Sequence, residues 1–257
     1  MDASASPIAD QFVSIVNDCH SAGKGVVIIH NIDKLPESGF DRERSKQIVA
    51  KNSTLDLYWL VRDGGLMLLL SGLLKRSAAF SGCELRVFCL GEGAAQLEQL
   101  QRDVQRFLYE LRIQATVQVL NVRDADRCSH CQSPNHDISR RMEKFLPHLQ
   151  YVSASETDDQ RSKREEGETR RRVEGLPPKP LPSEDQATRC LHASIKLNAT
   201  VRMHSEGKAE LVLLSMPPPP KDEPAANYMQ YLDALLDGLP PTLVVRGYRR
   251  SVATIYQ

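Results

Sequence analysis

The sequence predicts an α/β domain built on a mostly parallel sheet with helices on both faces. Apolar residues alternate between strand spacing and helix spacing over the first 122 residues, and the same alternation returns near residue 186. Between these blocks the chain is charged and rich in proline, without a periodic apolar pattern. We therefore expect one domain in two blocks, residues 1–122 and 186–257, interrupted by a flexible insertion over residues 123–185.

The first block opens with a helix and a short strand. Apolar residues from Ile8 to Cys19 recur at helical spacing, and Gly23 follows where such a helix ends. The run Val26–Ile29 is β-branched and continuously apolar. This composition is typical of a strand in a parallel sheet, so we expect this strand to be buried on both faces.

Three more strands alternate with two helices in the rest of this block. The strand patterns cover residues 55–61, 83–90 and 113–122. The helix patterns cover residues 66–75 and 97–111, and the second has the clearest amphipathic stripe in the chain. Because each helix lies between two strands, the strands are expected to be joined by right-handed crossovers.

The second block predicts two helices and three strands. A helix over residues 187–198 precedes an apolar strand over residues 209–216, which four consecutive prolines end. A helical stripe follows from Tyr228 to Leu236. The last two strands, Thr242–Arg246 and Val252–Tyr256, are joined through Gly247 and are expected to form a hairpin.

Charge and composition exclude several classes of function. The 33 basic and 33 acidic residues give a net charge of zero, whereas a nucleic-acid-binding protein usually carries a basic excess. The longest apolar run, Leu66–Leu74, is interrupted by Ser71 and Gly72 and is shorter than the ~20 residues that a bilayer requires. Six irregularly spaced cysteines favour a reducing compartment over a disulfide scaffold.

Two short motifs carry candidate chemistry. Asp63-Gly64-Gly65 joins a predicted strand to a predicted helix, where backbone amides can hold a phosphate or simply form a tight turn. Cys128 and Cys131 have C-x-x-C spacing, and His136 follows as a candidate third zinc ligand. His148 is a candidate fourth ligand, but a second ligand pair at such spacing is absent from the sequence. Redox chemistry of the two thiols is the alternative, although a thioredoxin-type motif would open a helix directly after a strand.

Aromatic and hydroxyl residues provide further candidates. Tyr58 and Trp59 lie in an aliphatic strand, where burial is the ordinary explanation and a stacking platform for a nucleotide base is the alternative. Ser153, Ser155 and Thr157 lie in the charged insertion, where a kinase can reach an extended backbone. We expect regulatory phosphorylation within this insertion.

Several stretches resemble the cytosolic C-terminal domain of cation-chloride cotransporters. The stretch over residues 57–70 (LYWLVRDGGLMLLL) carries the resemblance, together with residues 192–198 (HASIKLN) and 243–256 (LVVRGYRRSVATIY). Residues 107–119 (FLYELRIQATVQV) and 227–232 (NYMQYL) are closer to the potassium-chloride branch than to the sodium-dependent branch. The resemblance covers both patterned blocks and leaves out the insertion.

The resemblance implies a regulatory and dimerisation domain rather than an enzyme. Its fold would be similar to universal stress proteins, and its parent would be an integral membrane protein that carries potassium and chloride together, with this domain at the cytoplasmic face. The implied partners are the transmembrane transport unit, a second copy of the chain, and protein kinases and phosphatases, with no nucleic acid.

The resemblance also implies ATP as a candidate regulatory ligand, at Tyr58 and Trp59. The family often has an inhibitory phosphorylation site directly after the histidine that matches His192, but this chain has Ala193 there and Ser194 is out of register. The alternative to this assignment is a soluble nucleotide-binding protein of the universal stress type, which would use the same sheet to hold ATP.

Overall fold

The computed structural model describes most of both predicted blocks and a short part of the predicted insertion. The described residues are 7–35, 53–59, 65–91, 94–121, 136–149, 184–220 and 223–248. Within them no helix is both long and apolar enough to cross a membrane.

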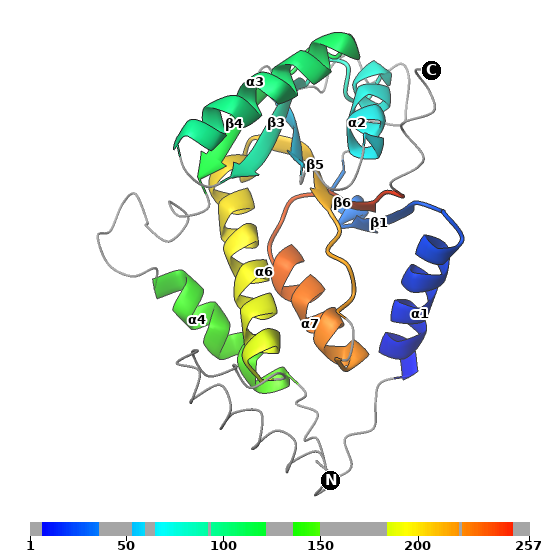
Figure 1. The fold of residues 1–257 in the computed structure, drawn as a ribbon, viewed down its shortest axis with the longest axis vertical. Coiled ribbons are helices and arrows are strands. Elements are labelled where there is room, and N and C mark those ends of the chain that lie inside the picture. Colours follow the sequence, from blue (N-terminus) through cyan, green and yellow to red (C-terminus); the bar gives the residue numbers. More distant parts are fainter. Residues whose placement is uncertain are drawn as a thin grey trace, which may run out of the picture.

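A six-stranded sheet forms the centre of the molecule, with the strand order β1-β6-β5-β2-β3-β4. The strands are β1 Val26–His30, β2 Thr54–Trp59, β3 Glu84–Gly91, β4 Thr116–Asn121, β5 Ala209–Ser215 and β6 Thr242–Arg246. All neighbouring pairs are parallel except β1 and β6, which are antiparallel. The predicted fold class is therefore confirmed, and strands from both predicted blocks lie side by side in one sheet (Figure 1).

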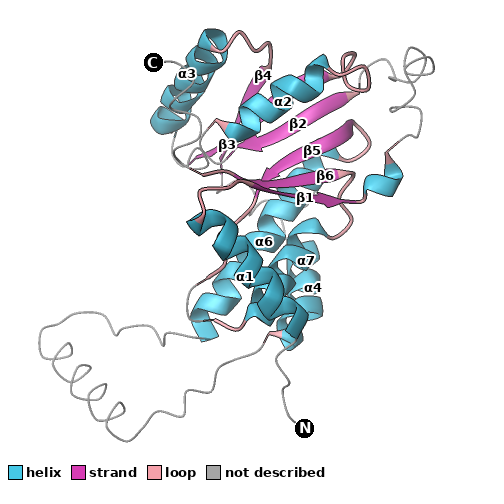
Figure 2. Ribbon diagram, turned by 90° about the vertical axis from the view of Figure 1, so that its right-hand side faces the viewer, coloured by secondary structure: helices cyan, strands magenta, loops and turns pink. Residues whose placement is uncertain are grey.

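Helices cover both faces of the sheet (Figure 2). One face carries α2 (Leu66–Arg76) and α3 (Ala94–Glu110), and the other carries α1 (Pro7–Ser21), α4 (His136–Phe145), α6 (Glu184–Ser205) and α7 (Ala225–Leu236). Each face has its own apolar core, because successive residues of a strand point to opposite sides. Two short 3-10 turns complete the described elements, Ile32–Lys34 and Leu146–His148.

The strand β1 differs from its prediction. It forms an edge of the sheet, and the side chains of Val27 and Ile29 are 47% and 52% exposed. Only alternate residues of β1 face the core, among them Val26 and Ile28. The expectation of burial on both faces was wrong because a β-branched run specifies a strand without specifying its position in the sheet.

The predicted C-terminal hairpin also needs correction. Val252–Tyr256 lies outside the described residues, but β6 pairs with β1 on one side and with β5 on the other. Both hydrogen-bonding edges of β6 are therefore occupied, and neither is free for a hairpin partner.

The helix α4 lies within the stretch that the sequence analysis assigned to a flexible insertion. Its buried apolar residues, Ile138 and Phe145, join the same core cluster as α6 and α7, and so does Leu149, which follows the short turn Leu146–His148. Met142 packs against that cluster and completes a stripe at helical spacing. Charged neighbours hid this stripe, so the prediction of an unpatterned segment was wrong for residues 136–149.

Candidate functional site

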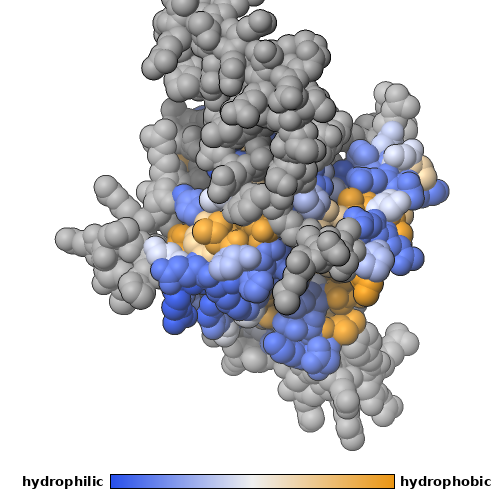
Figure 3. All heavy atoms as spheres, turned by 90° about the horizontal axis from the view of Figure 1, so that it is seen from below, coloured by the Kyte–Doolittle hydropathy of each residue, from blue (hydrophilic) through white to orange (hydrophobic). Residues whose placement is uncertain are grey.

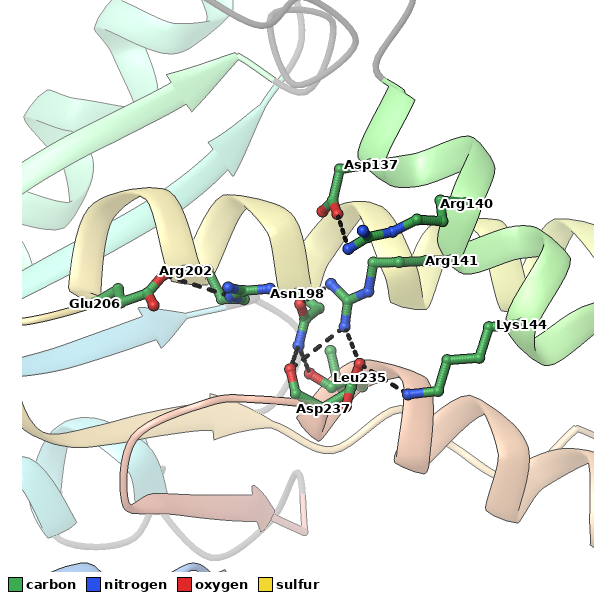
Figure 4. Close-up of polar contacts among 9 residues, drawn as sticks. All are labelled: Asp137, Arg140, Arg141, Lys144, Asn198, Arg202, Glu206, Leu235 and Asp237. Carbon is green, nitrogen blue, oxygen red and sulfur yellow. Dashed lines mark hydrogen bonds and ion pairs between the residues drawn. The ribbon is translucent and has the colours of Figure 1, made fainter.

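Polar side chains from α4, from α6 and from the residue after α7 meet where α4 packs on the core (Figure 4). Arg141 comes from α4, Asn198 from the middle of α6, and Asp237 from the residue that follows α7. The apolar stripe of α4 turns Arg141 toward the core as well, so its side chain is only 5% exposed. We call this group the α4 junction.

Arg141 makes most of the polar contacts of the junction. Its guanidinium donates to the Asn198 side-chain oxygen, to the Asp237 carboxylate at 2.9 Å and to the Asp237 backbone carbonyl at 3.3 Å. Lys144, one turn further along α4, reaches the same carboxylate oxygen at 3.4 Å. Two cations of α4 thus share one acidic residue of the core.

Asn198 connects the junction to the end of α7. It is fully buried, and its amide nitrogen donates to the carbonyl oxygens of Leu235 at 2.7 Å and Asp237 at 2.9 Å. Carbonyls in the last turn of a helix lack partners within the helix, so a buried helix end needs such donors. Asn198 therefore closes α7 and presents its oxygen to α4 at the same time.

The charges at the junction act on Asp237. Partial burial alone would raise the pKa of this carboxyl group, but the hydrogen bond from Arg141 and the positive charges of Lys144 and Arg141 outweigh burial and hold the pKa below its ordinary value. Asp237 therefore stays ionised at neutral pH and attracts both cations of α4.

A second buried polar group joins the sheet to the end of α6. The Asp56 carboxylate accepts hydrogen bonds from Arg86 Nε at 2.7 Å and from Ser205 Oγ at 2.5 Å. Because the Ser205 hydroxyl donates its one hydrogen bond to Asp56, it accepts a hydrogen bond from the Tyr58 hydroxyl, with 2.8 Å between the two oxygens. Arg86 also donates to the His204 carbonyl at 3.1 Å, so the guanidinium is positioned at the C-terminus of α6.

Both polar groups hold elements together rather than arrange a reaction. Their hydrogen bonds and ion pairs connect α4 to the core and α6 to the sheet, and each group ends on a helix C-terminus. Within the described ranges, no three His, Cys, Asp or Glu side chains gather closely enough to hold a metal ion.

Comparison with known proteins gives the family. Residues 23–257 match the family described as Solute carrier family 12. The chain belongs to solute carrier family 12. It is 39% identical to Cation-chloride cotransporter 2 of Oryza sativa subsp. japonica over 97% of the chain and 24% of that protein.

Two other family members give the same relationship. Cation-chloride cotransporter 1 of Arabidopsis thaliana and Cation-chloride cotransporter 1 of Oryza sativa subsp. japonica are each 36% identical, again over 97% of the chain and 24% of their own length. The chain therefore spans about a quarter of the length of these relatives. The predicted relationship to cation-chloride cotransporters is confirmed, and these names describe transporters rather than enzymes.

For this solute carrier family 12 chain, the structure separates the two aromatic candidates. Tyr58 and Trp59 point to opposite faces of β2 and lie in different core clusters. Tyr58 stacks on Phe88 at 4.6 Å between ring centroids, and Trp59 stacks on Phe107 at 6.0 Å. Both rings are buried, so neither offers a surface on which a nucleotide base could stack.

The other sequence candidates lie mostly outside the described residues. This holds for Cys128, Cys131, Ser153, Ser155 and Thr157. His136 is the first residue of α4, and its side chain is not described. In the Asp63-Gly64-Gly65 motif only Gly65 is described, and it precedes α2 with a φ of −82°, which other residues adopt as readily.

The α6 segment of the family resemblance is described in full. Ala193, which stands where many family members have a threonine, is exposed, while Ser194 is only 9% exposed. Ser194 therefore cannot present its hydroxyl to a kinase in this fold.

Proposed function

We propose that this chain is the cytoplasmic regulatory domain of a potassium-chloride cotransporter. The family match supports the link to cation-chloride cotransport, and the relatives are about four times as long as the chain. The sequence stretches closer to the potassium-chloride branch support the choice of potassium as the cation. The proposed partners are a transmembrane transport unit, a second copy of the chain, and kinases and phosphatases.

The docking of α4 is the observation that carries the regulatory role. This helix belongs to the segment between the two blocks, and it is anchored in the core through the buried Arg141. A modification in that segment can therefore act on the core through a defined contact. Ser153, Ser155 and Thr157 follow α4 closely in the sequence and are the proposed phosphorylation sites.

Two measurements on the full-length transporter that carries this chain test the proposal. The first is chloride-dependent rubidium uptake with and without external sodium. We expect uptake in both media, because potassium-chloride transport does not use sodium. Uptake only in the presence of sodium would overturn the assignment to the potassium-chloride branch.

The second measurement concerns regulation. Deleting residues 150–183 removes the proposed phosphorylation sites but keeps α4 on the core, so it does not expose the apolar seat of that helix. A matched variant replaces only Ser153, Ser155 and Thr157 with alanine. Both are expected to abolish the change of flux that follows kinase inhibition, and unchanged regulation in both would refute the regulatory role.

A further inference from the structure

A second arginine lies beside the α4 junction. Arg202 follows Asn198 by one turn on α6, and its side chain is 36% exposed (Figure 4). Its Nε is buried and has no hydrogen-bond partner among the described residues. The described ionic partner of this nitrogen is Glu206, at 3.4 Å.

This arginine is close to the acidic residue that α4 holds. Gly238 directly follows Asp237, and a Cβ atom added to Gly238 would lie 3.9 Å from both Nε and Cζ of Arg202. The guanidinium therefore packs against the turn that carries the Asp237 carboxylate. Contact with that carboxylate would require a change in the side-chain rotamer of Arg202.

The helix α4 depends on its contacts with α6 and α7 for stability. It has only 10 residues, and isolated helices shorter than about 12–15 residues are marginal in water. Its apolar stripe and Arg141 face the core, while most of its other charged side chains are exposed. If α4 loses its contacts with the core, it is therefore expected to melt.

Release of α4 would leave Asp237 without its two cations. The carboxylate stands directly after the C-terminus of α7, where the helix dipole disfavours a negative charge. On the core side of the junction, Arg202 lies beside the turn that carries Asp237. We propose that Arg202 takes over Asp237 when α4 leaves, so that two arginines compete for one carboxylate and set how often α4 is released.

This competition is a property of the folded chain and does not depend on the transporter assignment. Its use as a regulatory device rests on the proposed function. Binding of Arg202 to Asp237 would stabilise the released state, and binding of Arg202 to Glu206 would favour the docked state. The balance between Glu206 and Asp237 therefore adjusts the release of α4.

Hydrogen–deuterium exchange of residues 136–149 in the complete 257-residue chain tests the competition. Arg202→Met removes the competitor and is expected to slow exchange in α4, by up to about fivefold for an ion pair of this exposure. Glu206→Gln frees Arg202 and is expected to speed exchange. A role of Arg202 in packing alone predicts the opposite effect of Arg202→Met, because lost contacts loosen the neighbouring structure.

Two further variants serve as controls. Arg106→Met breaks an ion pair of the same i,i+4 kind with Glu110 on α3 and is expected to leave α4 exchange unchanged. Arg141→Met is expected to speed α4 exchange roughly tenfold or more, because a buried charge partner is lost. If Arg141→Met fails to fold, as judged by urea unfolding through Trp59 fluorescence, Arg141→Lys replaces it.

The proposal is overturned if Arg202→Met leaves α4 exchange unchanged or makes it faster, or if Glu206→Gln does not speed it. Flux measurements separate this result from the regulatory role. In the full-length transporter, Arg202→Met and Glu206→Gln should shift kinase-regulated flux in opposite directions. If exchange changes as expected and flux does not, the proposed regulatory function fails while the arginine competition stands.

Discussion

Replacing Asp56 with asparagine is expected to destabilise the folded chain by about 3 kcal/mol. Asp56 is fully buried and is the counter-charge of Arg86, whose side chain is 12% exposed. Removing one partner of a buried ion pair costs about 3–5 kcal/mol, because the remaining charge loses both water and its partner. The lower end applies here, since Arg86 keeps its bond to the His204 carbonyl and its position over the Phe88 ring.

Urea unfolding followed through the fluorescence of Trp59, the only tryptophan, measures this loss. With a urea m-value of about 3 kcal/mol per molar, the midpoint should fall by about 1 M. Ser205→Ala is the matched control, because it removes one hydrogen bond to the same carboxylate and should cost about 1 kcal/mol. If Asp56→Asn lowered the free energy of unfolding by no more than Ser205→Ala does, the ion pair would not hold α6 to the sheet.

Three further predictions address other parts of the fold. Burial, and after it the charges of nearby lysine or arginine residues, lower the pKa of His30 and His204 below 6.5. The unfolded chain therefore binds protons more readily than the folded chain, and the free energy of unfolding should fall as the pH drops below 6.5. Replacing both with glutamine should flatten the dependence of the urea midpoint on pH, and an unaltered slope would contradict this cause. Gly207 has a φ of 70° with open space around it, so Gly207→Ala should cost about 1 kcal/mol from backbone strain alone, measured by the same unfolding assay. Phe145→Ala should speed hydrogen exchange in α4 while the urea midpoint followed through Trp59 stays constant, because Phe145 anchors α4 and Trp59 lies in the core on the other face of the sheet. If faster exchange came with a lower urea midpoint, α4 would not move independently of the rest of the fold.

The strands and helices of the first block follow from apolar spacing. Val104 and Leu108 of the predicted stripe lie on the buried face of α3, and the alternation in β2 places Tyr58 and Trp59 in different cores. These features depend on local patterns of two and 3.6 residues, which the sequence displays directly. The helices therefore lie where the patterns predicted them, apart from their exact ends.

The position of each strand could not be predicted in the same way. Val26–Ile29 is as apolar as an inner strand, yet β1 stands at an edge and pairs with β6, more than 200 residues later in the chain. That pairing depends on where the crossovers place β5 and β6, and no local pattern records it. For the same reason the sequence could not show that both edges of β6 are occupied.

The α4 junction was missed for a different physical reason. Arg141 is 57 residues from Asn198 and 96 residues from Asp237, so no short motif contains the three. Each is an ordinary polar residue until the helices pack. The spacing of Ile138, Met142 and Phe145 was the available signal, because a buried stripe on one helix implies a second surface that receives it.

Release of α4 would change the surface of the molecule more than its fold. The amide of Asn198 closes α7 through bonds to Leu235 and Asp237 that do not involve α4, so the end of α7 keeps its partners when the helix leaves. The core residues of α6 that share a cluster with Phe145 would then lose part of their cover. Described surfaces of the molecule, seen from below in Figure 3, already mix hydrophilic and apolar residues. Newly exposed apolar area requires a partner or leads to association, so a domain that releases α4 under regulation should change what it binds, and its sheet should remain intact.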